Sequence, residues 1–156
     1  MARELREVVY VDGVRTAFGK AGPAGIFWRT RADDMAVKVV REVLRRNPQL
    51  PAERIDDVAI AATAQGGDQG LTLGRDVALL AGLPHTVPGF AVDRMCAGAL
   101  TAVTACAGEI AMGAADVVEA EARLREHLAR RRGGAEAHQL RLDARVGEAG
   151  ESHARW

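Results

Sequence analysis

Residues 90–100 read FAVDRMCAGAL, a short β-like run that turns into a helix rich in alanine and glycine. The thiol of Cys96 falls at the first turn of that helix, where backbone N–H groups lack intrahelical partners and the helix dipole is positive. That position can lower the pKa of a thiol and favour the nucleophilic thiolate. Cysteine is also among the most buried residue types, so packing as a small hydrophobe is the alternative role.

Strand and helix patterns alternate on both sides of this stretch. Strands are predicted for the apolar runs at 8–11 (VVYV), 58–62 (VAIAA), 90–92 (FAV) and 116–118 (DVV), and the first two are continuous enough for burial on both faces. Helices are predicted over 33–46, 72–81 and 96–113, with a helical turn at 51–54 and a glycine-rich loop at 64–70. Such repeated strand–helix units predict an α/β fold with a mainly parallel sheet.

The helix predicted over 96–113 has almost no polar face, because alanine and glycine dominate it. A helix whose side chains are small and apolar on every face is expected to be packed closely on every side, as a helix between two sheets would be. If one of those sheets is missing, an apolar helix face and a sheet edge stay uncovered, which favours association or aggregation. We therefore expect the chain alone to be marginally stable or oligomeric.

Four segments together resemble the N-terminal part of the thiolase family. They are VDGVRTAFGK at 11–20, the helix and strand that follow ADD at 32–34 and IDD at 55–57, LGRDVALLAGLP at 73–84, and RMCAGAL at 94–100. The resemblance covers residues 7–120 and implies an incomplete thiolase-like N-terminal half-domain. The family usually has asparagine where Asp93 stands and often Gly-Ser-Gly at 97–99. An ionised Asp93 close to the thiol would oppose formation of the thiolate.

This resemblance implies an acyltransferase, an acetyl-CoA acetyltransferase or acetyl-CoA C-acyltransferase of fatty acid metabolism. Cys96 would be the nucleophile and would carry the acyl group as a thioester intermediate. Coenzyme A thioesters would be the substrates, no tightly bound cofactor is expected, and the residues that hold coenzyme A stay unknown. The alternatives are a fragment of a ketoacyl-synthase-like condensing enzyme and a non-catalytic domain that binds a partner subunit.

The resemblance ends near Ala120, so the chain divides into residues 1–120 and an arginine-rich tail, 121–156. The tail has few residues that could form a core and is expected to be poorly ordered or helical. It is either the product of a frameshift in a thiolase gene or a genuine short tail. The family's later histidine and second cysteine motifs are not found, so we expect this truncated chain to be inactive alone.

None of the four histidines is expected to serve as the catalytic base. His127, His138 and His153 lie in no segment that resembles the family's histidine motif, and His85 precedes the nucleophile in a loop. Cys106 lies within the predicted helix about 15 Å from Cys96, too far for a disulfide, and is expected in the core.

The amino-acid composition limits the kinds of molecule that the protein is expected to bind. The 156 residues include 21 basic and 21 acidic side chains, and this balance argues against nucleic acid or an anionic membrane as a partner. No cysteine or histidine pair has metal-ligand spacing. The N-terminus is charged with both signs, and the apolar stretch 96–115 is rich in small residues, so we expect a soluble, cytoplasmic protein. Association as a homo-oligomer, or through the exposed helix face, is also expected.

Overall fold

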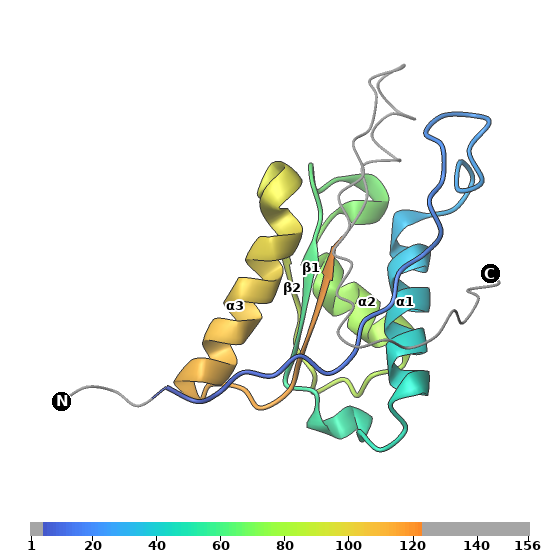
Figure 1. Cartoon of the computed structure of the whole chain (residues 1–156). Coiled ribbons are helices and arrows are strands. Elements are labelled where there is room, and N and C mark those ends of the chain that lie inside the picture. Colours follow the sequence, from blue (N-terminus) through green and yellow to red (C-terminus); the bar gives the residue numbers. More distant parts are fainter. Residues whose placement is uncertain (1–4, 123–156) are drawn as a thin grey trace.

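The structure, a computed structural model, describes residues 5–122, so every prediction for the arginine-rich tail beyond 122 lies outside the described residues. The elements form three layers, with helices on both faces of a small sheet (Figure 1). In chain order they are α1 (Ala32–Arg46), β1 (Asp57–Ala61), α2 (Leu73–Ala81), β2 (Phe90–Val92), α3 (Gly98–Met112) and β3 (Val118–Ala122). Single 3-10 turns lie at Ala52–Arg54, Gly67–Gln69 and Met95–Ala97.

The sheet has the strand order β2-β1-β3, and both pairs are parallel. The register places Ala59 beside Phe90 on one side of β1 and beside Ala120 on the other. The predicted α/β fold with a parallel sheet is therefore confirmed. The central strand is buried on both faces from Val58 to Ala61, as its continuous apolar run predicts.

The two faces of the sheet carry separate cores. Side chains of β1 pack against α1 and α2 in a large cluster that includes Val40, Val58, Ile60, Leu73 and Val77, all at most 1% exposed. On the other face, a small cluster of Ala59, Ala102 and Cys106 joins β1 to α3. Among the described residues, α3 is thus covered on one side only, and Leu100 and Met112 are exposed on it.

Two glycines bring α2 directly onto the sheet. A Cβ atom added to Gly74 would overlap the carbonyl oxygens of Phe90 and Val58, and one added to Gly89 would overlap the backbone at Gly74. Only residues without a side chain permit this approach of helix and strand. α2 then ends at Gly82, whose φ of 97° is typical of a helix C-terminus, as predicted.

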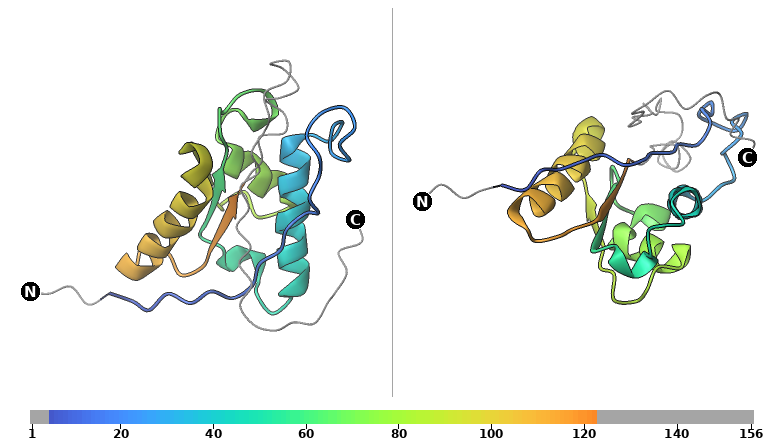
Figure 2. Two further views of the ribbon diagram at one scale, coloured as in Figure 1. Left: turned by 45° about the horizontal axis from the view of Figure 1, so that its top comes forward. Right: turned by 60° about the horizontal axis from the view of Figure 1, so that its bottom comes forward.

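The prediction of a strand at 8–11 is wrong. These residues are extended but belong to no strand, and Val9 and Val11 are 69% and 75% exposed. The chain is held instead at Arg6, whose N–H donates to the Ala111 carbonyl at the end of α3, and at Asp12, which accepts from Asn47 at the end of α1. Between these points it crosses from α3 to α1 past the β3 side of the sheet (Figure 2).

Within the described residues, Met95–Met112 is long and apolar enough, by length and composition, to cross a membrane. Core helices of soluble proteins pass the same test. In this structure α3 packs on β1 and β3 through Ala102 and Cys106.

Candidate active site

Cys96 lies beyond the carboxyl end of β2, in the 3-10 turn Met95–Ala97 that leads into α3. The parallel register places the carboxyl end of β1 at the same edge of the sheet. In open parallel α/β sheets, ligands bind in the crevice outside the carboxyl ends of the strands. Cys96 therefore lies at the edge of the sheet where such folds bind their ligands. α3 begins at this edge, which is its upper end in Figure 1.

Hydrogen bonds between side chains and the backbone tie the turn that carries Cys96 to the loop that follows β1. One carboxylate oxygen of Asp93 accepts the N–H of Ala64 at 2.8 Å, and the other accepts the N–H of Met95 at 3.1 Å. The hydroxyl of Thr63 donates to the Met95 carbonyl at 3.1 Å. Sequence reasoning treated Asp93 only as a charge near the thiol and missed this positioning role. The available signal was the tendency of aspartate to bond the backbone two residues on.

The backbone is strained at this edge of the sheet. Among the described residues, the non-glycine residues with positive φ are Ala64, Leu71, Thr72 and Met95, with values from 38° to 55°. Three of them belong to the loop between β1 and α2, and the fourth immediately precedes Cys96. Such conformations cost of order 1–3 kcal/mol each and cluster at active sites and ligand clamps.

The two cysteines differ sharply in their surroundings. Cys96 is exposed, whereas Cys106 is 2% exposed and lies between α3 and the sheet. Burial raises the pKa of the Cys106 thiol to about 12, with smaller contributions from the charges of Glu109 and Asp57. Cys106 is therefore a protonated, inert thiol at neutral pH, and its predicted place in the core is confirmed.

The first turn of α3 packs closely against β1 of the sheet. A Cβ atom at Gly98 would lie 3.2 Å from the Cβ of Ala61, so this position leaves little room for a larger residue. The Thr101 hydroxyl donates to the Ala97 carbonyl at 2.9 Å and accepts from the Arg94 guanidinium at 3.1 Å. These contacts hold the segment on both sides of Cys96 in one arrangement.

No histidine in residues 5–122 lies beside Cys96. His85 is the one histidine in that range, and it precedes β2 whereas Cys96 follows it, so the two lie at opposite ends of the strand. The Arg75 guanidinium donates to the His85 carbonyl at 2.7 Å and holds its loop there. His127, His138 and His153 lie outside the described residues. Within the described part of the chain, no group of three or more histidine, cysteine or acidic residues is arranged to bind a metal ion.

Comparisons with known proteins relate this chain to one family. A family model for the N-terminal domain of thiolase matches residues 8–121. The 3-ketoacyl-CoA thiolases of Yersinia enterocolitica and Acinetobacter baumannii are both 39% identical to this chain. These alignments cover 72% of this chain, but only 29% and 28% of the relatives.

The crystal structure of an acetyl-CoA acetyltransferase from Bacillus anthracis superposes with a TM-score of 0.71 at 25% identity. That superposition covers 90% of this chain and 36% of the acetyltransferase. The chain thus spans about a third of the length of the proteins it resembles. The family match covers most of the chain, and the parallel sheet accords with it, so this chain belongs to the thiolase family and corresponds to its N-terminal domain.

Proposed function

We propose that this chain carries the nucleophile of a thiolase-type acyltransferase, with Cys96 as the residue that accepts the acyl group from a coenzyme A thioester. The observation that carries the proposal is the contrast between the exposed thiol of Cys96, in the turn that leads into α3, and the buried thiol of Cys106 within α3.

In the proposed step, the Cys96 sulfur attacks the thioester carbonyl carbon and forms a new C–S bond. The bond from that carbon to the coenzyme A sulfur breaks, and coenzyme A leaves as a thiolate that takes up a proton. The product is an acyl-cysteine, and the acyl group then passes to a second acceptor. That second transfer needs a general base or acid, which no histidine in residues 5–122 is positioned to supply.

The names of the relatives support this substrate class. They are thiolases that act on 3-ketoacyl-CoA and an acetyltransferase that uses acetyl-CoA. We propose that this chain alone is acylated once and does not turn over, because loss of general acid–base catalysis costs about 10²–10⁴-fold in rate. Association through the exposed face of α3, with a second copy or another subunit, remains a prediction.

The test is acylation of the full chain by acetyl-CoA, followed by intact mass and peptide mapping. We expect one acetyl group, located on Cys96, and none in Cys96→Ala. The matched control is Cys106→Ala, which should be acylated as the parent is, because Cys106 is buried. Acetylation at another residue, or equal and slow reaction of both cysteines with iodoacetamide near neutral pH, would contradict the proposal.

A further inference from the structure

The carboxylate of Asp93 joins two separate segments at the edge of the sheet where Cys96 lies. Asp93 stands directly after β2, and its side chain is exposed. One of its oxygens accepts the N–H of Ala64, in the loop that follows β1, at 2.8 Å. The other accepts the N–H of Met95, in the turn that carries Cys96, at 3.1 Å. We call these two hydrogen bonds the clamp.

Both residues that donate to the clamp have strained backbones. The φ angle is 55° at Ala64 and 47° at Met95, in the left-handed region that disfavours any residue with a Cβ atom. Such conformations persist only where the surrounding structure fixes them. Asp93 therefore holds the backbone at the two places where it would relax. Relaxation at Met95 would displace Cys96, because Cys96 is the next residue in the chain.

The chain is fixed by packing after Cys96 and by hydrogen bonds before it. A Cβ atom at Gly98 would lie 3.2 Å from a side chain of β1, so the start of α3 has little freedom. On the other side of Cys96, the N–H of Met95 is held by Asp93, and its carbonyl is held by the Thr63 hydroxyl at 3.1 Å. The direction in which the thiol points therefore depends on the clamp.

A carboxylate suits this clamp better than the amide of the same shape. An ionised carboxylate has two acceptor oxygens, whereas an amide has one oxygen and an NH₂ group that donates. Asparagine at position 93 would keep one of the two hydrogen bonds and turn its NH₂ group toward the other backbone N–H. The variant Asp93→Asn therefore opens half of the clamp and changes the volume of the side chain very little.

The negative charge of Asp93 acts on Cys96 in the opposite sense. A negative charge close to a thiol disfavours the thiolate, so removing the charge should make Cys96 easier to ionise. A small alkylating reagent needs only an accessible thiolate. Attack on a bound thioester also needs the sulfur to be aligned with the carbonyl carbon. The two reactions therefore separate the effect of the charge from the effect of the clamp.

We infer that Asp93 is a positioning residue for Cys96: its carboxylate holds Ala64 and Met95 in their left-handed conformations and thereby aims the Cys96 sulfur at the bound thioester. Asp93 acts through the backbone and takes no part in bond formation. The alignment of the sulfur outweighs the less favourable ionisation of the thiol. This inference rests on the acyl transfer proposed above for Cys96.

Single-turnover acetylation of the full chain, over a range of acetyl-CoA concentrations, tests the role. In Asp93→Asn the rate at saturating acetyl-CoA should fall on the order of tenfold to 10²-fold, as small misplacements of a reacting atom do. The concentration that gives half of the maximal rate should stay the same. Alkylation of Cys96 by iodoacetamide, located by peptide mapping, should be unchanged or faster at neutral pH. Acetylation as fast as in the parent, or alkylation that falls as far as acetylation, would overturn the inference.

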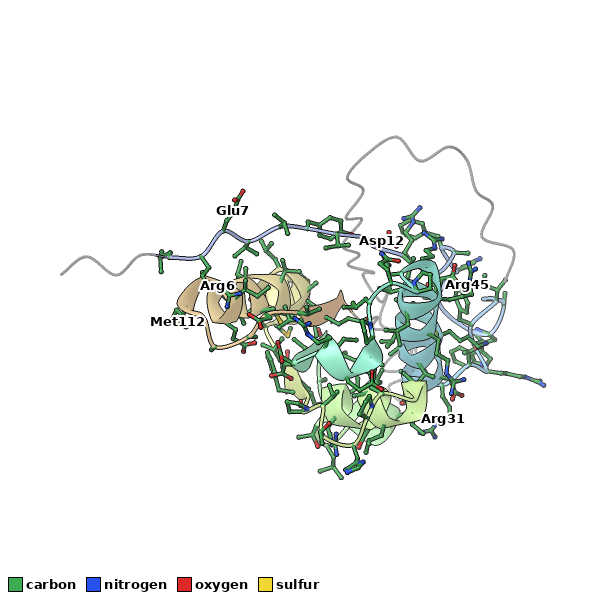
Figure 3. The ribbon with its side chains drawn as sticks, turned by 90° about the horizontal axis from the view of Figure 1, so that it is seen from below. Arg6, Glu7, Asp12, Arg31, Arg45 and Met112 are labelled. Atoms are coloured by element: carbon green, nitrogen blue, oxygen red, sulfur yellow. The ribbon has the colours of Figure 1, made fainter. Side chains whose placement is uncertain are left out.

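Asp68→Asn is the matched control. Asp68 lies in the same loop, and its carboxylate accepts the N–H of Ala32 at 2.9 Å, at the start of α1 beside Arg31, which Figure 3 labels. This variant removes one charge from the loop and keeps an oxygen for that bond, so it should be acetylated as the parent is. An equal loss of acetylation in both variants would mean that the charge of this edge matters and the clamp does not, which also overturns the inference.

Amide hydrogen exchange of the same variants tests the clamp without acyl transfer. In Asp93→Asn, exchange at Ala64 or at Met95 should be faster on the order of tenfold, because a hydrogen bond to a charged group is lost. Neither amide should change in Asp68→Asn. A parent chain that is not acetylated at Cys96 would contradict the proposed function alone, and the exchange rates would still decide whether the clamp exists. Unchanged exchange at both amides in Asp93→Asn overturns the inference, whatever the acetylation shows.

Discussion

Among the described elements, α1 and α2 together bury one face of the sheet, whereas α3 is the helix that covers the other. The first face holds thirteen buried hydrophobic residues in one cluster, and the second holds three. Helices on the first face also meet each other, since α1 packs against α2, whereas the main packing partners of α3 among the described elements are the sheet strands and the short turn before it. The comparison teaches that the α1 and α2 side of the sheet holds most of the core of the described residues, whereas the α3 side, which Cys96 precedes, holds little of it.

The difference is also visible in how closely each helix approaches the strands. At Gly74 of α2, backbone atoms of two strands occupy the place of a side chain, whereas a Cβ atom at Gly108 of α3 would have no neighbour within 4 Å. Replacing glycine by alanine should therefore destabilise the fold at position 74 of α2 and stabilise it at position 108 of α3.

Gly74→Ala and Gly108→Ala should change stability with opposite signs. Gly74→Ala pushes α2 off the sheet, and overpacking of this kind costs about 1–3 kcal/mol or more of the free energy of unfolding. Gly108→Ala meets no neighbour and should add about 0.5–1 kcal/mol, the difference in helix propensity between the two residues. Urea unfolding of both variants, with matched m-values, measures the two changes. A loss at Gly108 equal to that at Gly74 would mean that α3 is as tightly enclosed as α2.

Local sequence patterns were sufficient to predict the elements that form the well-covered face of the sheet, which is the face that α1 and α2 bury. The 3.6-residue period of 33–46 predicted α1, and the structure begins that helix one residue earlier, at Ala32. The continuous run of apolar residues predicted β1, and Gly82 predicted the end of α2. In these segments the local preference and the tertiary environment agree, because each has a full set of neighbours.

Local sequence patterns failed to predict the structure where it depends on contacts with residues far away in the sequence. The run VVYV at 8–11 has strong strand character, yet a strand also needs a neighbour, and Arg6 and Asp12 are anchored to the ends of two different helices. The hydrogen bond from Ala64 to Asp93 joins residues 29 positions apart, so the sequence contained no local sign of it. Cys96 was predicted at the first turn of a helix and lies instead in the 3-10 turn that precedes α3, and its catalytic role remains a prediction.

Glu42 should make the well-covered face sensitive to acid. Hydrogen bonds from Arg45, and then from Arg46, lower the pKa of this carboxyl from its ordinary value of 4.5 to about 2. A group whose pKa is lower in the folded state stabilises that state above its ordinary pKa, and this stability is lost as the pH falls. We expect the contribution of Glu42, about 1 kcal/mol for pairs at the surface, to disappear between pH of about 4.5 and about 2.

The measurement is the free energy of unfolding of the parent and of Glu42→Gln over that pH range. The difference between them should be largest near neutral pH and should close on acidification. Glu53→Gln serves as the control, since Glu53 is an exposed carboxylate on the turn that follows α1. A constant difference at every pH would mean that packing, and not charge, makes Glu42 important.

Glu109 should respond to pH in the opposite sense and by a smaller amount. Burial against the sheet, and then the charge of Asp57, raise the pKa of this carboxyl. Because the pKa is higher in the folded state, the ionised form destabilises the fold, and this penalty is relieved as the pH falls through the raised pKa. Glu109→Gln should therefore raise the free energy of unfolding at neutral pH by roughly 0.5 kcal/mol, with little change in acid. Unfolding curves of this variant at both pH values test the sign. A destabilised Glu109→Gln at neutral pH would show that this carboxylate is stabilised by a partner on the α3 face, and that the face is better organised than its small core indicates.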